Sequence, residues 1–133
     1  MSQENVGLVY RLNDAFKRRD LDAYLALCDP DVEYYSRFGE VEGGGPYRGH
    51  EGVRSWWEKL LAFSPDFRTE IEAVRALGTV TVARVRQRAQ GAESDAPVDQ
   101  TQWIVTRWRN GKAVWGHIFL SEAEALEAAG VRE

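Results

Sequence analysis

The sequence predicts an α+β fold in which helices come first and a β-meander follows. Apolar residues recur at steps of three and four early in the chain, but the period changes to two after Pro65. The first spacing gives one apolar stripe on a helix, and the second is typical of a half-buried strand. Near the end, Asn110-Gly111 supplies the positive φ angles of a tight hairpin turn. Helices followed by a run of strands are typical of the α+β class.

Three N-terminal helices are predicted from apolar stripes and caps. The stripe of the first consists of Val6, Val9, Leu12 and Phe16. A second, short helix begins after Asp20, a good N-cap residue. It is expected to end at Pro30, because a proline forces the residue before it out of the helical region. A third helix is expected at about 50–63, with Trp56 and Trp57 on its buried side.

Strands and a final helix are predicted for the rest of the chain. A strand at 32–37 precedes a glycine-rich loop at 39–49. Four more strands are expected at 67–76, 80–89, 98–108 and 113–120. Their short connections make them antiparallel neighbours. Ser121 and Glu124 form a capping box that opens a short C-terminal helix, and Gly130 ends it.

Composition and charge argue against several classes of function. The 133 residues fit one domain over positions 1–133. A net charge of −4 without a long basic run argues against nucleic-acid binding, and no apolar run is long enough to cross a bilayer. Since Cys28 is the only cysteine, neither an intramolecular disulfide nor a thiolate zinc site is expected. We therefore predict a cytoplasmic protein with no metal, no cofactor, no nucleic-acid partner and no membrane partner.

Four segments carry a resemblance to a known family: DLDAYLALCDPDVEYYS, YRGHEGVRSWW, RNGK and SEAEALEAAG. With them, essentially the whole chain resembles the SnoaL-like polyketide cyclase branch of the nuclear-transport-factor-2-like superfamily, to which ketosteroid isomerases and limonene-epoxide hydrolases also belong. The resemblance implies a cone-shaped barrel, in which a curved, mostly antiparallel sheet wraps round three helices and encloses a deep pocket. The motifs are mostly caps, turns and core, so they are specific for the fold and not for the chemistry.

The resemblance also implies which side chains face the pocket, mostly even-numbered ones on the last three strands. The expected lining is Leu12, Asn13, Tyr34, Ser36, Trp56, Trp57, Arg84, Arg86, Gln102, Ile104, Thr106, Gly116, Ile118 and Leu120. On the strand at 80–89 an alternative stays open, because charged side chains are normally exposed. There, Ala83, Val85 and Ala89 would face inward and the arginines would face solvent.

The acid–base chemistries of the superfamily are not matched by this lining. The groups with which ketosteroid isomerases move a proton correspond to Tyr34, Leu12 and Ile104, and none of these is a carboxylic acid. SnoaL-type cyclases use an acid near position 118 and a polar group near 104, where this chain has isoleucine twice. A pocket without a titrating base lacks the rate gain of ~100-fold or more that general acid–base catalysis supplies.

Limonene-epoxide hydrolases are matched only in part. Arg84 corresponds to the arginine between their paired aspartates, but Arg86 and Ile118 stand where the two acids are expected.

Two functions therefore stay open for a pocket that binds a small, largely apolar organic molecule. The first is a SnoaL-like isomerase, cyclase or hydrolase that acts by positioning and hydrogen bonding. The second is a non-catalytic ligand-binding or protein-interaction module. A carbonyl or carboxylate of the ligand would meet Gln102, Tyr34 or the arginines. The best catalytic candidates are Tyr34, Arg84, Gln102 and His117.

The opposite face of the sheet is also rich in apolar side chains, which predicts a dimer. This face carries Trp103, Val105, Trp115, His117 and Phe119. Such a patch is rarely left in water, and no further helix is expected to cover it. A second copy related by a two-fold axis would cover it. If the last strand were shifted by one residue, His117 would instead enter the pocket as a general base.

Overall fold

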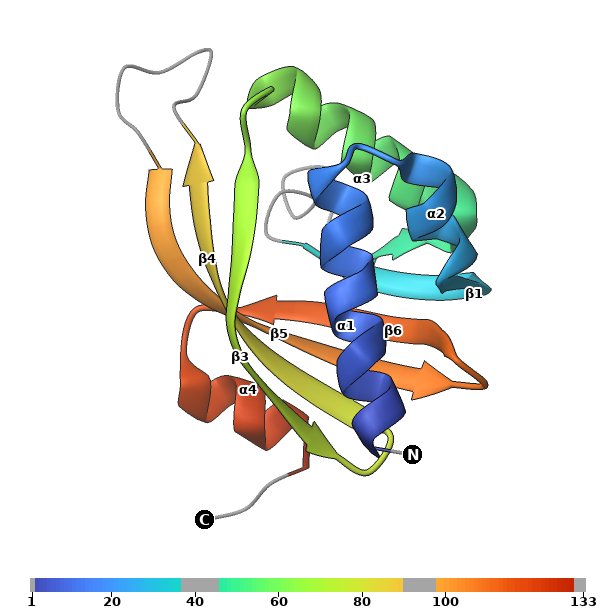
Figure 1. Ribbon diagram of the computed structural model, residues 1–133, viewed down its shortest axis with the longest axis vertical. Helices are drawn as coiled ribbons and strands as arrows, with labels where there is room; N and C mark the ends of the chain where they lie inside the picture. The colour runs from blue at the N-terminus through green and yellow to red at the C-terminus, as the bar shows by residue number, and fades with distance from the viewer. Residues whose placement is uncertain (1, 37–45, 90–97, 131–133) are drawn as a thin grey trace.

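A six-stranded sheet curves around three helices in the computed structural model, which describes residues 2–36, 46–89 and 98–130 (Figure 1). The helices are α1 (Ser2–Lys17), α2 (Leu21–Ala26), α3 (Gly49–Phe63) and α4 (Glu122–Ala128). The strands are β1 (Cys28–Tyr35), β2 (Tyr47–Arg48), β3 (Arg68–Leu77), β4 (Val80–Ala89), β5 (Val98–Arg109) and β6 (Lys112–Phe119). None of the helices in these ranges is both long and apolar enough to span a membrane.

The sheet has the strand order β2-β1-β6-β5-β4-β3. All neighbouring pairs are antiparallel except β1 and β6, which run parallel. The α+β class and the mostly antiparallel, cone-shaped wrap are confirmed. The sheet stays open, however, because β2 and β3 are the outermost of its described strands and do not pair with each other.

The second helix and the first strand differ from the prediction. α2 ends at Ala26, and Cys28 and Pro30 already belong to β1. Proline is tolerated there because the pairing of β1 with β6 is irregular between Cys28 and Glu33. The prediction that Pro30 ends a helix was therefore wrong. The chain turns into the strand earlier because Leu27 accepts a hydrogen bond from the backbone N–H of Ala113 in β6, at 2.8 Å.

The other turns and caps follow the local sequence signals. Asn110 and Gly111 have φ angles of 54° and 76°, as the β5–β6 hairpin requires. The Ser121 hydroxyl accepts a hydrogen bond from the backbone N–H of Glu124 and caps α4. Within the loop expected at 39–49, residues 47–48 form the short strand β2, and residues 39–45 lie outside the described ranges.

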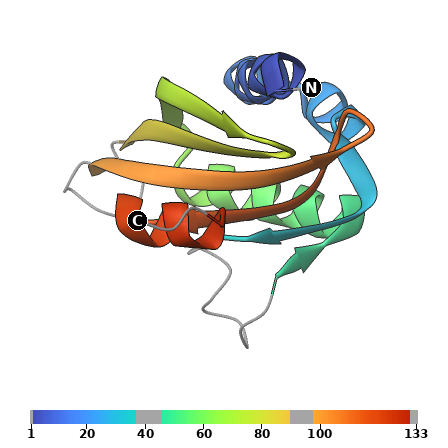
Figure 2. The ribbon, with the colours of Figure 1, turned by 90° about the horizontal axis from the view of Figure 1, so that it is seen from below.

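Two apolar clusters lie on opposite faces of the sheet. The inner core lies between the concave face and α1, α2 and α3, and Phe16, Trp56 and Trp57 are buried in it. The outer cluster lies under α4 and contains Val105, which is completely buried, and Ala125. Figure 2 shows α1 and α4 on opposite sides of the strands. The long α1 and α3 span the concave face without filling it, and this leaves room for a cavity.

Candidate ligand-binding cavity

A cavity of about 280 Å³ lies inside the cone, between the concave face of the sheet and α1, α2 and α3. Side chains from every element except β2 and α4 line it. Its volume is just below the range of roughly 300–1,000 Å³ that is typical of ligand pockets. The space therefore suits a compact molecule.

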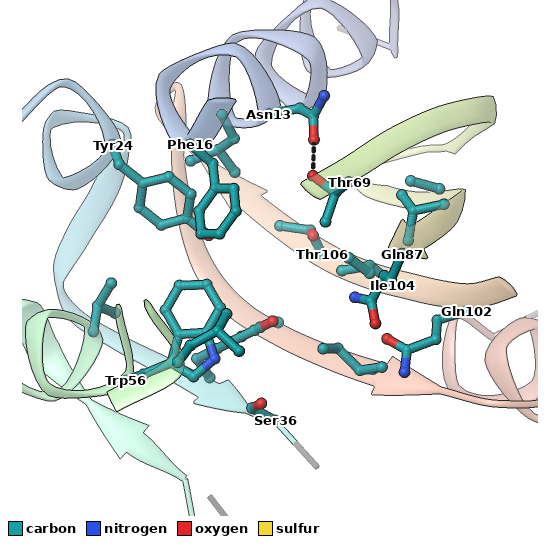
Figure 3. Close-up of a pocket in the computed structure, with 18 of the residues that line it drawn as sticks. Asn13, Phe16, Tyr24, Ser36, Trp56, Thr69, Gln87, Gln102, Ile104 and Thr106 are labelled. Carbon is teal, nitrogen blue, oxygen red and sulfur yellow. Dashed lines mark hydrogen bonds between the residues drawn. The ribbon is translucent and has the colours of Figure 1, made fainter. Parts of the chain in front are cut away.

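One wall of the cavity is aromatic. Phe16 of α1, Tyr24 of α2 and Trp56 of α3 form it, as Figure 3 shows. Tyr34 of β1 completes it. The rings of Tyr34 and Trp56 meet edge to face, with centroids 4.9 Å apart. The ring centroid of Trp56 also lies 6.0 Å from those of Phe16 and Tyr24. Rings packed in this way offer a rigid, apolar surface to the flat face of a ligand.

The opposite wall, formed by β3, β4 and β5, carries neutral polar groups. Thr69 donates a hydrogen bond of 2.5 Å to Oδ1 of Asn13, which ties β3 to α1 at the cavity edge (Figure 3). Gln87, Gln102 and Thr106 are buried and line the cavity. Oε1 of Gln102 has no hydrogen-bond partner among the described residues. The polar wall therefore offers hydrogen-bonding capacity without charge.

None of the described lining residues is Asp, Glu, His, Lys or Arg. The titratable groups of the wall are Tyr24, Tyr34 and Cys28. Burial raises the pKa of both tyrosines well above the ordinary value. Burial also raises the pKa of Cys28 to about 12, although Lys112 acts in the opposite direction. All three groups are therefore protonated near neutral pH, so they are weak bases and poor nucleophiles.

Most of the predicted lining residues surround this cavity. The structure places on its surface Leu12, Asn13, Tyr34, Ser36, Trp56, Gln102, Ile104, Thr106, Gly116 and Ile118. The other four, Trp57, Leu120, Arg84 and Arg86, do not line it. Trp57 is buried in the inner core beside Phe16, with ring centroids 5.0 Å apart, and Leu120 is 45% exposed. Trp57 and Leu120 were therefore wrongly predicted to line the cavity. For the residues that do line it, ligand binding stays a prediction.

Arg84 and Arg86 of β4 face solvent, as in the alternative that the sequence analysis left open. Arg84 donates a hydrogen bond of 3.1 Å to Glu72, and Arg86 makes two, of 2.8 and 3.0 Å, to Asp99. Ala83 and Val85 take the inward positions on this strand. The pocket-facing assignment that the resemblance implied for the arginines is wrong, because an unpaired guanidinium in this apolar interior would lose its hydration.

Several lining residues were missed by the sequence analysis, and Gln87 matters most. The alternation of Ala83, Val85 and Gln87 against arginines was the available signal, since it places the glutamine on the inner face. Thr69 and Ile71 of β3 follow the same period of two. Val32 has the same parity as Tyr34 and Ser36, so alternation was the available signal for it too. Cys28 could not be identified in this way, because the second helix was expected to continue to Pro30.

The outer face carries the predicted aromatic residues, but part of it is covered within the chain. Trp103, Trp115 and Phe119 pack against the outer cluster together with Leu126 of α4. The assumption that no helix covers this face was therefore wrong. His117 stays on the outer side, stacked on Phe119 with ring centroids 4.3 Å apart. It does not line the cavity, so it is not a candidate for a base there.

Tyr34 packs directly on Gly116, which leaves little room for a side chain at position 116. The two residues are partners across β1 and β6, and a Cβ added to Gly116 would lie 3.1 Å from Cδ1 of Tyr34. We expect Gly116→Ala to lower the free energy of unfolding by about 1–3 kcal/mol, the usual cost of overpacking. Urea denaturation measures this. In a Tyr34→Ala background the same substitution should cost almost nothing; equal costs in both backgrounds would contradict the contact.

A metal site is not evident within residues 2–36, 46–89 and 98–130, where no group of three or more His, Cys, Asp or Glu side chains is placed to hold an ion. The lining residues offer neutral oxygens and aromatic faces, which suit an organic molecule better than a cation.

Solved structures share this fold over nearly the whole length of both chains. An NTF2-like protein of unknown function from Burkholderia pseudomallei superimposes with a TM-score of 0.79 and 25% identity, over 93% of this chain and 95% of that chain. TerC, co-crystallised with polyporic acid, superimposes with a TM-score of 0.76 and 18% identity, over 96% of this chain and 99% of that chain. IdmH of Streptomyces antibioticus, described as a proposed polyketide cyclase, superimposes with a TM-score of 0.73 and 24% identity, over 95% of this chain and 98% of that chain.

Sequence comparison gives the family. Comparison with curated proteins gave no match. The family model described as "SnoaL-like domain" matches residues 9–115. That match begins in α1 and ends within β6, so it includes β1 to β5 in full and β6 as far as Trp115. This chain belongs to the SnoaL-like domain family.

Proposed function

We propose that this protein binds a small, largely apolar organic molecule in the cavity inside the cone. The observation that carries the proposal is the cavity itself, with an aromatic wall on one side and neutral polar groups on the other. Concave, mostly apolar pockets with a few polar groups are the usual form of small-molecule sites. This chain shares its fold with TerC, which was co-crystallised with polyporic acid, and this supports an organic ligand.

Catalysis is the second candidate, and Tyr34 is the residue that favours it. Its raised pKa keeps the phenol protonated, so Tyr34 can donate a hydrogen bond to a carbonyl oxygen that gains negative charge during a reaction. No carboxylate or imidazole lines the described part of the cavity as a general base. We therefore place binding first and treat isomerase, cyclase or hydrolase activity as an addition that requires measured turnover.

The test compares two phenylalanine substitutions at adjacent positions of β4. Ala83→Phe places a ring in the cavity, whereas Arg84→Phe places the same ring on the outer face. Binding of 2-methoxynaphthalene is followed by isothermal titration calorimetry, and thermal melting verifies that both variants fold. We expect Ala83→Phe to abolish binding and Arg84→Phe to retain it. Equal binding by both folded variants would place the ligand site elsewhere.

We also propose that a second copy covers the outer face. A stacked row of rings lies there, formed by Tyr35, His117 and Phe119. The ring centroid of His117 is 5.1 Å from that of Tyr35 and 4.3 Å from that of Phe119. α4 covers Val105 and its neighbours but leaves this row half-buried. Aromatic rows of this kind are enriched in protein interfaces, and a two-fold dimer would bury both rows at once.

Light scattering after size-exclusion chromatography is expected to give twice the chain mass of 15.1 kDa. His117→Asp should shift the protein toward the monomer, because it adds a charge at the centre of the row. Tyr10→Asp is the control, since Tyr10 is 49% exposed on α1, away from the outer face. A monomeric wild type at micromolar concentration, or equal shifts for both variants, would rule this interface out.

A further inference from the structure

We infer that the ligand of this cavity is an uncharged alcohol or phenol whose hydroxyl group binds between Gln87 and Gln102. The inference rests on the proposed function and adds the chemical class of the ligand. It follows from three features of the polar wall: an unsatisfied buried amide, a second amide beside it, and the absence of charge among the described lining residues.

Gln102 supplies the hydrogen-bond acceptor that we expect the ligand to contact. It is only 4% exposed and lines the cavity, and its backbone is held opposite Val85 in the pairing of β4 with β5. Its Oε1 atom is buried without a partner among the described residues. A buried acceptor without a partner is unfavourable, because it has lost its hydrogen bonds to water. A ligand that donates a hydrogen bond to this oxygen replaces one of them, whereas a purely apolar ligand does not.

Gln87 supplies a second amide at the same place. The register pairs Gln87 with Gln100 and Val85 with Gln102, so Gln87 and Gln102 are diagonal neighbours on the cavity face. Long side chains reach each other at that spacing, and Figure 3 shows the two amide heads pointing into the same part of the cavity. An amide offers two donors and one acceptor, and a hydroxyl both donates and accepts. One hydroxyl can therefore donate to Gln102 and accept from Gln87.

The surroundings select a neutral group over a charged one. Arg84 and Arg86 are engaged with Glu72 and Asp99 on the other face of the sheet, so they cannot neutralise a carboxylate in the cavity. An ionised group buried without a counter-charge is strongly disfavoured. The carbon skeleton of the ligand would lie against the aromatic wall of Tyr34 and Trp56, opposite the two amides. An uncharged ring compound with one hydroxyl matches both walls.

Three naphthalene derivatives test the inference by isothermal titration calorimetry at pH 7: 2-naphthol, 2-methoxynaphthalene and 2-naphthoate. The first donates a hydrogen bond, the second only accepts, and the third is charged. We expect 2-naphthol to bind about 10-fold more tightly than 2-methoxynaphthalene, in line with one hydrogen bond to a buried neutral group. Binding of 2-naphthoate should be weaker than that of both.

Gln102→Met removes the acceptor at nearly constant volume. We expect it to reduce the preference for 2-naphthol to less than about 2-fold and to leave the affinity for 2-methoxynaphthalene unchanged. The ligand-free variant should melt at the same or a higher temperature, because it no longer buries an unsatisfied oxygen. Gln3→Met is the matched control, since Gln3 is exposed on α1 and does not line the cavity. The control should keep the preference.

The outcomes separate this inference from the proposed function. Equal affinities for the three probes, or a preference for 2-naphthol that survives Gln102→Met, would overturn the hydroxyl assignment but leave the cavity as a ligand site. Tightest binding of 2-naphthoate would overturn the neutral class. No heat of binding for any of the three probes would overturn the proposed function and this inference with it.

Discussion

Raising the pH from 9 to 12 is expected to destabilise the folded protein by several kcal/mol. The pKa of Cys28 is raised by burial from its ordinary value of 9.0 to about 12. Between these values the unfolded chain carries a thiolate, whereas the folded chain keeps the proton. Since the unfolded state then binds fewer protons, the free energy of unfolding falls as pH rises, by about 1.4 kcal/mol per pH unit. Below pH 9 this stabilisation is fully present.

Tyr24 and Tyr34 steepen the loss at higher pH. Burial raises the pKa of each above the ordinary value of 10.0. They therefore add to the slope only above about pH 10, where tyrosines of the unfolded chain begin to ionise. The interval between pH 9 and 10 isolates the contribution of Cys28.

Urea denaturation at closely spaced pH values measures this effect. The wild type should lose stability between pH 9 and 10, and Cys28→Ala should show a nearly flat profile there. Tyr10→Phe serves as the control, because Tyr10 is exposed and should leave the wild-type profile unchanged. A wild-type profile that is flat up to pH 10 would contradict the protected thiol.

Trp56→Ala is expected to lower the free energy of unfolding by about 3–5 kcal/mol, the usual cost of truncating a buried tryptophan. Trp56 is 6% exposed, and its ring contacts Phe16, Tyr24 and Tyr34 from three other elements. Its removal also enlarges the existing cavity, so the neighbouring rings would lose contacts that nothing replaces.

Trp115→Ala is the matched control for that experiment. Trp115 is half-buried on the outer face and contacts Arg107 and His117. Its truncation should cost about 2 kcal/mol or less at concentrations where the protein is monomeric. Chemical denaturation of both variants measures the two costs. Equal costs would contradict the assignment of Trp56 to the inner core and of Trp115 to the outer face.

The elements that were predicted well are those whose signals are local. The hairpin at Asn110 and the cap of α4 at Ser121 depend on the backbone preferences of a few consecutive residues. β4 was predicted with its observed bounds, because period-two alternation extends along the whole strand. The start of β1 at Cys28 was missed, because a hydrogen bond from the distant Ala113 to Leu27 decides where α2 gives way to the strand.

The sidedness of the sheet was harder to predict, because both of its faces are apolar. Alternation separates Gln102, Ile104 and Thr106 from Trp103 and Val105, but it does not say which set faces α1 to α3. The resemblance supplied that answer for β5 and β6, and it failed for β4. There the rule that arginines stay in water was the better guide, as Arg84 shows.

The sequence by itself determined the α+β order, the hairpin, the caps and the lack of a carboxylate at the expected catalytic positions. These features depend on residues close together in the chain, or on which residue types are present at all. Only the tertiary structure decided that Gln87 lies beside Gln102, that α4 covers part of the outer face, and that Gly116 makes room for Tyr34. Such contacts join elements far apart in the chain, and their geometry is set by how the whole sheet curves.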